Sequence, residues 1–315
     1  MGREISLRAS DILRYKHMER QLERCSIERF KRLSEGGCIP VHLARGGEAV
    51  LIEPYRKNPR LELPDHLGLR ALEISLKENK KLRDAGIDGD WIDGKKLAVH
   101  SADKYQDRIR LRVSMIRWSE IEALRGLSLE DMLRLKVLKL DTYTHLVCKE
   151  DGHELLVVGL QGKPPDPRMG KQNGRPRWTL SANGTVDAEI LCTAGSPARV
   201  WVENSRNELR EELGIDPEAD LQYLGLILDA KVSIGALGIV GMMRTGLTLR
   251  QVEDARKQAI DQVEVEAIDA IAVEQEAFIR YLEANREGMT PQLITSLVML
   301  GYSLWGESFL AGAER

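Results

Sequence analysis

The sequence has few cysteines and no recognisable leader segment. Its four cysteines, among 315 residues, are widely separated and form neither a C-x-x-C pair nor a Cys/His cluster: Cys25, Cys38, Cys148 and Cys192. This spacing argues against a disulfide framework and against a structural zinc site. The first twenty residues, MGREISLRASDILRYKHMER, are charged throughout and lack the apolar core of a secretory signal. Both absences predict a reducing, cytoplasmic location.

One uncharged run approaches the length of a membrane span. It is GMTPQLITSLVMLGYSLWG, residues 288–306. Thr290 followed by Pro291 is typical of an N-cap and a first helical residue. Leucines then recur at helical spacing: Leu293, Leu297, Leu300 and Leu304. The pattern predicts a buried or interface helix rather than a membrane segment, and it would suit a homodimer interface.

Charge is distributed unevenly along the chain. Residues 1–140 hold 29 Lys and Arg against 22 Asp and Glu, whereas the remainder holds 17 against 27. The basic residues of the first part are interspersed with acidic ones, and no nucleic-acid-binding motif is recognisable. We therefore expect a mixed, solvated surface rather than a nucleic-acid-binding surface.

Residues 1–138 predict a small α+β domain. Helices are expected over 10–24, 26–35 and 64–85, and strands over 38–44, 49–54, 95–101 and 108–118. A glycine turn, Arg45-Gly46-Gly47-Glu48, joins the first two strands. The histidines of this part are isolated, so no catalytic signature of its own is visible.

Residues 139–315 predict a second domain with longer strands. DTYTHLVCK and HELLVVGLQ flank Glu150-Asp151-Gly152, which is typical of a β-hairpin. A loop rich in Gly, Pro, Lys and Arg follows, and then the strand-like segment WTLSANGTV. Further elements are expected in this order: a helix over 197–213, strands within 220–242, and helices over 248–260, 273–286 and 291–310.

Three glutamates gather near the end of the helix at 197–213. Glu208, Glu211 and Glu212 stand at i, i+3 and i+4, so they are expected to project from one patch. Gly214 marks the C-terminus of the helix, where negative charge is disfavoured by about 0.3–1 kcal/mol. A divalent cation held by these carboxylates would account for their placement; a solvated acidic face is the alternative.

The segment around these glutamates resembles the box of the Nudix hydrolase family, G-x5-E-x7-R-E-U-x-E-E-x-G-U, with U apolar. The residues that match its second half are Glu208, Leu209, Glu211, Glu212, Gly214 and Ile215. The preceding order of elements is similar too: a hairpin, then a tryptophan-bearing strand with a glycine turn. The resemblance covers residues 140–285. It implies that the three glutamates bind Mg²⁺ or Mn²⁺ on a diphosphate and that one of them helps to deprotonate a water.

The first half of the box departs from the family pattern. Asn207 stands where the arginine belongs, and Arg206 lies one position early, turned by about 100° on a helix. Glu189, which follows the glycine turn, lies farther from the helix than the box prescribes, as an insertion would explain. These departures leave a second interpretation open, in which the domain has weakened catalysis and acts as a nucleotide-sensing or protein-interaction module.

Further candidate residues flank the box. Arg175 and Arg177, in the basic loop before Trp178, would suit substrate phosphates, although an exposed loop is also basic without a ligand. Trp178 would stack on a base or pack in the core. By resemblance, Glu264 or Glu266 would supply a further metal ligand, with an ordinary exposed position as the alternative.

These features predict an α+β protein in two parts. A smaller α+β domain, residues 1–138, precedes a Nudix-like α/β/α sandwich with a mixed sheet, residues 139–315. The resemblance implies hydrolysis of a nucleoside diphosphate-linked or related small molecule with Mg²⁺ or Mn²⁺, a cation that would neutralise the diphosphate charge as the leaving oxygen departs.

Overall fold

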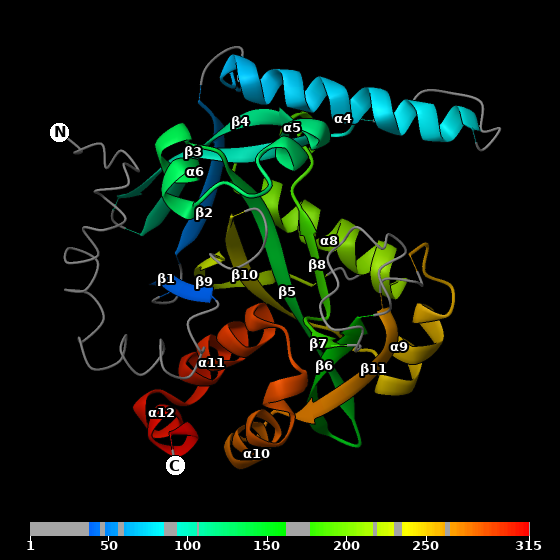
Figure 1. The fold of residues 1–315 in the computed structure, drawn as a ribbon. Helices are drawn as coiled ribbons and strands as arrows, with labels where there is room; N and C mark the ends of the chain where they lie inside the picture. Colours follow the sequence, from blue (N-terminus) through cyan, green and yellow to red (C-terminus); the bar gives the residue numbers. More distant parts are fainter. Residues whose placement is uncertain are drawn as a thin grey trace.

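A mixed sheet forms the centre of the protein. The computed structural model describes residues 38–44, 48–55, 60–84, 93–105, 107–161, 177–216, 219–229, 235–261 and 265–314. Within these residues the sheet has 11 strands, with the central order β1-β9-β10-β5-β3-β4-β2 (Figure 1). The strands are β1 (Cys38–Leu43), β2 (Ala49–Pro54), β3 (Lys95–Tyr105), β4 (Arg108–Arg117), β5 (Leu138–Glu150), β6 (His153–Gln161), β7 (Arg177–Thr179), β8 (Ala182–Thr185), β9 (Leu221–Asp229), β10 (Ala236–Arg244) and β11 (Val265–Ala272). β2 pairs with β4 and β5 pairs with β10 in parallel, and the other pairs are antiparallel.

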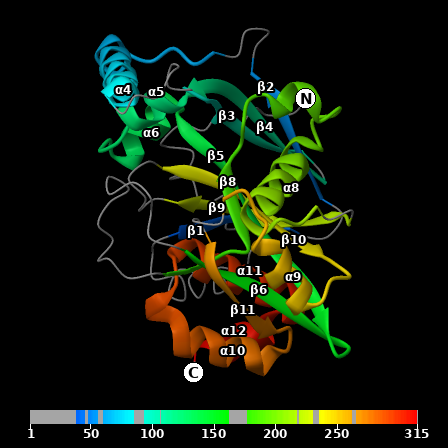
Figure 2. The same ribbon diagram turned by 90° about the vertical axis from the view of Figure 1, so that its right-hand side faces the viewer.

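Helices cover both faces of this sheet (Figure 1 and Figure 2). They are α4 (Asp65–Asp84), α5 (Trp118–Ala123), α6 (Leu129–Leu135), α7 (Ile190–Thr193), α8 (Val200–Leu213), α9 (Leu249–Arg256), α10 (Gln275–Asn285), α11 (Pro291–Trp305) and α12 (Glu307–Ala313). Side chains of β5 alternate between two layers. Leu146 and Cys148 pack with residues of α8 and α9, whereas Tyr143 and Val147 pack with residues of α10, α11 and α12. The predicted α+β fold, with a mixed sheet between helical layers, is confirmed.

Most elements expected from the sequence are present. The hairpin of β5 and β6 turns at Asp151 and Gly152, whose φ angles of 48° and 84° are the left-handed values that a type I′ turn requires. The prediction lacks α5, α6 and α7, because helices of four to seven residues offer too few positions for a periodic pattern. The helices expected over 10–24 and 26–35 lie outside the described residues.

The first two strands form, but the hairpin expected between them does not. β1 pairs antiparallel with β9, and β2 pairs parallel with β4, so these consecutive strands lie at different places in the sheet. A glycine turn is a local signal, whereas the partner of a strand depends on nonlocal packing. Val50 and Ile52 of β2 are buried in one apolar cluster with Leu111 and Val113 of β4.

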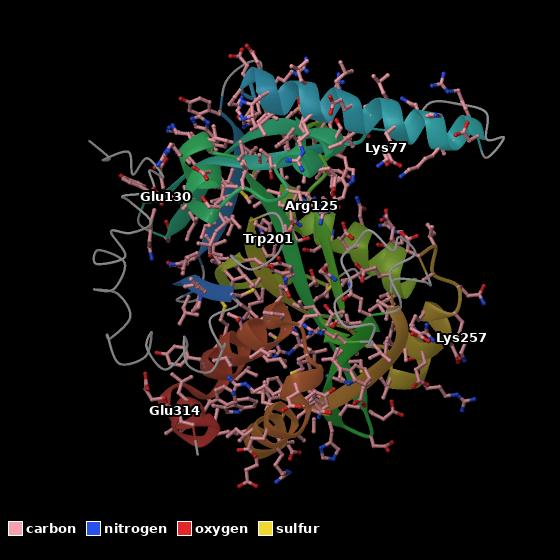
Figure 3. The ribbon with its side chains drawn as sticks, in the orientation of Figure 1. Lys77, Arg125, Glu130, Trp201, Lys257 and Glu314 are labelled. Atoms are coloured by element: carbon pink, nitrogen blue, oxygen red, sulfur yellow. The ribbon has the colours of Figure 1, made fainter. Side chains whose placement is uncertain are left out.

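The sheet continues across the boundary expected at residues 138 and 139. β3 pairs with the start of β5, through Ala98 with Lys139 and Val99 with Leu138. Strands β2, β3 and β4 also share an apolar cluster with Trp201 of α8, which Figure 3 labels near the middle of the molecule. The N-terminal strands are therefore joined to the rest by hydrogen bonds and by packing. The division into two domains stays a prediction.

α11 confirms the predicted buried helix near the end of the sequence. The Thr290 hydroxyl accepts the N–H of Leu293 at 3.3 Å, as an N-cap does, and Pro291 follows it. Leu293, Leu297 and Leu300 are buried in the core of their own chain. Among the described residues, no helix is long and apolar enough to cross a membrane. The homodimer suggested by this leucine stripe stays a prediction, and these leucines already serve the core.

β5 and β6 separate along their length, and the segment of β7 and β8 lies in the gap. β6 pairs with β5 near their turn and with β7 farther along, while β8 pairs with the other half of β5. Ser181 is buried in the short connection between β7 and β8, and its hydroxyl links β5 to β6. Its hydroxyl donates to the carbonyl oxygen of Val157 at 2.5 Å and accepts the N–H of Leu146 at 2.8 Å. One small side chain thus holds the inserted segment to both β5 and β6.

We expect Ser181→Ala to lower the free energy of unfolding by about 1–3 kcal/mol, because it leaves a buried carbonyl and a buried N–H without this partner. Chemical denaturation of the purified chain measures the change. Ser303→Ala, at an exposed position of α11, is the matched control and should change stability by less than about 0.5 kcal/mol. Equal stability of Ser181→Ala and the unmodified chain would mean that the link between β5 and β6 through this hydroxyl does not stabilise the fold.

His145 makes the stability of this fold depend on pH. It is fully buried on β5, and burial lowers the pKa of its imidazole from 6.5 to about 4, an effect that the backbone of Ser296 partly offsets. Between these two values the unfolded chain binds a proton that the folded chain does not. The folded state is therefore fully favoured above pH 6.5 and loses stability as the pH falls toward 4.

We expect this loss to reach about 3 kcal/mol over the whole interval. Urea denaturation at a series of pH values measures it. In His145→Leu, which cannot bind a proton at this position, the dependence on pH should shrink by the same amount. A pH profile that His145→Leu leaves unchanged would contradict the assignment.

Candidate functional site

α8 carries the three glutamates, and a glycine determines where it ends. Gly214 adopts the left-handed conformation at φ 67°, and its N–H bonds to the carbonyl oxygen of Arg210 at 3.1 Å. A Cβ at this position would also overlap the backbone of Ala255 in α9. Glycine is required both for the end of the helix and for the close approach of α9. The helix was predicted to begin at residue 197. Residues 197–199 instead form a turn, so α8 begins at Val200.

One row of α8 side chains faces β8 and the residues that follow it. Asn204, Glu208 and Glu212 stand at i, i+4 and i+8, so they share one side of the helix. Asn204 accepts the N–H of Asp187 at 3.3 Å and donates its amide N–H to the hydroxyl of Thr142 in β5 at 2.8 Å. These two bonds hold the middle of α8 to the sheet.

Glu212, at the end of this row, faces inward. Its carboxylate accepts the N–H of Asn183 at 3.0 Å, and the residue is only 1% exposed. Spacing alone predicts an outward patch shared with Glu208 and Glu211, but the packing of α8 directs this carboxylate to the backbone of β8. A buried carboxylate needs such a donor, so Glu212 helps to fix α8 in place.

Glu208 lies in the middle of the row, half-buried against Gly184 of β8. The two are so close that a Cβ at Gly184 would overlap the Glu208 carboxylate. The amide nitrogen of Asn204 lies 3.5 Å from Glu208 Oε1. The glycine-bearing strand and the first matching glutamate of the box therefore meet at one point, although they are far apart in the sequence.

Glu211 projects outward into negatively charged surroundings. Partial burial raises the pKa of its carboxyl group, and the charges of Asp261 and Asp187 raise it further, whereas Lys96 and Arg210 lower it. The carbonyl oxygen of Glu211 also accepts the N–H of Asp261 at 2.9 Å, which brings the residues after α9 beside the end of α8. The site thus gathers carboxylates from three places in the sequence.

Lys96 brings a positive charge to this site from the N-terminal part of the chain. Its ammonium group pairs with Asp187 at 2.5 Å. Backbone hydrogen bonds fix this contact, because the N–H of Leu97 in β3 donates to the carbonyl oxygen of Val186 at 2.9 Å. Residues 1–138 carry no catalytic signature in the sequence, yet they supply a cation next to the carboxylates.

Asn207 and Arg206 occupy the positions where the box departs from the family pattern. The guanidinium group of Arg206 donates to Glu203 at 3.4 Å and to the carbonyl oxygen of Ala219 at 3.3 Å. The side-chain oxygen of Asn207 accepts from Arg210 at 3.0 Å. Through these contacts, Arg206 braces α8 against the chain that leads into β9.

Trp178 is partly buried and packs against the core. Its side chain lies against the apolar cluster formed with α10, α11 and α12, and its carbonyl oxygen accepts the N–H of Thr290 at 2.8 Å. This cluster covers the face of the sheet opposite α8. Arg177 lies next to it on β7, half-buried. The structure therefore does not bring Trp178 to the carboxylates of α8, and a substrate-binding role for either residue stays a prediction.

Three further residues were predicted to bind metal or substrate: Glu266, Arg175 and Glu264. Glu266 is exposed on β11. Arg175 and Glu264 lie outside the described residues. Their roles in substrate and metal binding stay predictions.

Four residues of this site were not predicted from the sequence: Asp187, Asp261, Asn204 and Lys96. Asn204 stands four residues before Glu208, so helical spacing alone could have placed it in the same row. Nothing local marks Asp187, Asp261 or Lys96, because they meet α8 only through the pairing of β3 and the return of the chain after α9.

The donor chemistry of the site fits a hard divalent cation. Glu208 and Glu211 offer carboxylate oxygens, which Mg²⁺ and Mn²⁺ prefer, while Glu212 is turned to the backbone. The described residues include no group of three or more His, Cys, Asp and Glu side chains close enough together to hold a metal ion. Charge and donor type therefore suit a cation, whereas the convergence of three ligands is not present in this arrangement.

No family model matches the sequence, and no curated protein matches it. Solved structures do match. The NUDIX domain of Shewanella oneidensis NrtR, complexed with ADP ribose, is 12% identical, covers 58% of this chain and 97% of its own, and has a TM-score of 0.36. The Ap4A hydrolase of C. elegans is 15% identical over 53% of this chain and 99% of its own, with a TM-score of 0.31. A NUDIX hydrolase from Alicyclobacillus acidocaldarius is 8% identical over 51% and 89%, with a TM-score of 0.38.

The resemblance to the Nudix box rests on the chain's own residues. The second half of the box lies on α8, and α8 lies against a glycine-bearing strand. That strand belongs to a mixed sheet between two helical layers, and α8 belongs to one of these layers.

Proposed function

We propose that this chain is a divalent-metal-dependent hydrolase of small diphosphate substrates that carry a nucleoside. The observation that carries the proposal is the meeting of Glu208 with Gly184, which joins the acidic helix to the glycine-bearing strand. Glu211 lies close by and shares its surroundings with Asp187 and Asp261. This concentration of carboxylates would repel a bare diphosphate, so a cation has to stand between the two.

Glu208 and Glu211 are the proposed ligands of Mg²⁺ or Mn²⁺. When bound, such a cation supplies positive charge to the diphosphate and lowers the pKa of a bound water. Asn204 orients Glu208 by its side-chain amide, and Glu212 keeps α8 in register through the backbone of Asn183. These contacts hold Glu208, and the helix that carries Glu211, in place, as electrostatic catalysis requires.

Positively charged groups around the site would hold the substrate. Lys96 is already beside Asp187 and would attract the phosphate groups. Arg175 and Arg177 remain proposed phosphate ligands, and Trp178 a proposed contact for the base, although its partly buried side chain packs against the core. Glu264 remains a proposed further carboxylate ligand for the cation.

A second candidate function is binding of a nucleotide without turnover. Two observations favour it. Glu212 is buried and accepts a backbone N–H, which leaves fewer carboxylates to converge on a cation. Asn207 replaces the arginine of the box, and Arg206 contacts Glu203 instead. A domain of this kind would sense the ligand and pass the signal to a protein partner.

We expect Glu208→Gln and Glu211→Gln each to lower kcat/KM by at least about 100-fold, because each removes a charge that would bind the cation. Conversion of each substrate into its two phosphorylated products would be measured by anion-exchange chromatography, with Mg²⁺ or Mn²⁺, across nucleotide sugars, dinucleoside polyphosphates and nucleoside triphosphates. Glu253→Gln, at an exposed position of α9, is the matched control and should leave kcat/KM unchanged. Glu212→Gln keeps an acceptor for the N–H of Asn183, so any loss it causes reflects its charge rather than its contact.

The same assay separates the two candidate functions. Hydrolysis of any member of the panel that Glu208→Gln abolishes supports the hydrolase. No turnover on any member, together with tight binding of one nucleotide that Glu211→Gln does not weaken, would contradict the hydrolase and favour the binding module. Calorimetry with the unmodified chain measures that binding.

Gly184→Ala should reproduce the effect of Glu208→Gln on kcat/KM, because the added methyl group overlaps the Glu208 carboxylate and displaces it. The carboxylate is the end of a flexible side chain, so we expect the melting temperature to stay within about 4 °C of the unmodified chain. Gly94→Ala is the control, since its Cβ would meet no atom within 4 Å. Full activity of Gly184→Ala would show that the position of Glu208 does not matter for turnover.

A further inference from the structure

α4 is a long helix with one side left open. Its 20 residues span about 30 Å. It lies across one end of the molecule, and Figure 2 shows it at the edge farthest from α12. Among the described elements, α5 makes the main contact with it, and its buried residues are Leu67 and Ala71. The opposite side of the helix faces outward, and its side chains stand away from the rest of the described residues in Figure 3.

Three leucines form a stripe along that outward side. Leu69, Leu72 and Leu76 are 63%, 56% and 57% exposed. Their spacing of three and then four residues places them on one face of the helix, as in the seam of a two-helix coiled coil. A contiguous exposed apolar stripe of this kind marks a surface that another element covers.

Charged residues at the two ends of the stripe have opposite signs. Asp65 precedes the leucines on the same face, and Lys80 and Arg83 follow them. Glu62 adds a second negative charge just before the helix begins. All four side chains are exposed. This face of α4 is therefore acidic at its N-terminal end, apolar in the middle and basic at its C-terminal end.

We propose that α4 pairs antiparallel with α4 of a second copy of this chain, about a two-fold axis near Leu72. In this register Leu69 meets the partner's Leu76, and Asp65 meets the partner's Lys80. Each contact then occurs twice, as two-fold symmetry requires. A parallel pair would instead place the acidic ends together and the basic ends together, which repels.

This surface is distinct from the candidate site and independent of the proposed hydrolysis. One pair of helices buries less area than most stable interfaces, so the dimer should form reversibly at micromolar concentrations of the chain. The leucines of α11, whose sequence pattern also suits an interface, are buried in their own chain.

Sedimentation velocity of the full chain over a range of concentrations tests the proposal. We expect a monomer–dimer equilibrium, and we expect Leu72→Glu to raise the dissociation constant by about 30-fold or more, because it places a charge at the centre of the interface. Ile260→Glu is the matched control. Ile260 is the most exposed of the large apolar residues described, at 78%, and lies away from α4, so its replacement should leave the dissociation constant unchanged.

Charge reversal tests the antiparallel register. Asp65→Lys alone and Lys80→Glu alone should each weaken the dimer by about fivefold, and mixing the two variants should restore it, because both ends then carry opposite charges. Lys77→Glu, exposed on α4 but turned away from the stripe, is the charge control and should have no effect.

Three outcomes would overturn the proposal. A chain that stays monomeric at every concentration has no such dimer. A dimer that Leu72→Glu does not weaken uses another surface. A monomer in which Leu72→Glu increases hydrogen exchange along residues 65–84 would mean that another part of the same chain covers the stripe.

Discussion

The contact between α8 and β8 is the interaction on which the fold around the site depends. Asn204, Glu208 and Glu212 face the strand from one side of the helix, and two of them accept backbone N–H groups there. β8 is itself held in place where β5 and β6 separate, by Ser181. A polar helix face can lie against a strand in this way only if the backbone donors are satisfied, because an unpaired buried N–H is costly. The position of the acidic helix therefore follows from a small number of hydrogen bonds rather than from apolar packing alone.

Because of this contact, the three glutamates lie in different surroundings. Glu212 is buried and structural, Glu208 occupies the space that Gly184 leaves, and Glu211 faces outward toward Asp187 and Asp261. A family motif treats the three as equivalent, but their surroundings make them chemically different. The carboxylates near Glu211 come from separate parts of the chain, so tertiary structure assembles this cluster.

The N-terminal strands extend the same sheet and reach the site. β3 pairs with both β4 and β5, and it places Lys96 beside Asp187. The apolar cluster that these strands share with α8 couples their stability to that of the acidic helix. α4, in contrast, makes its main contact with α5 and carries its leucines on the outside. One part of the N-terminal region thus contacts the residues around α8, whereas α4 carries an exposed stripe of leucines.

The sequence by itself determined most of the longer elements and where the acidic helix ends. The leucines of α11, the turn at Asp151 and Gly152, and Gly214 at the end of α8 are local signals, and short-range geometry decides them. Tertiary structure alone decided which strands pair, which is why β1 and β2 do not form the expected hairpin. It also decided that Glu212 faces inward and that Lys96, Asp187 and Asp261 gather near Glu211. The physical reason is range: caps, turns and periodicity act over a few residues, whereas strand partners and charge clusters depend on burial across the whole chain.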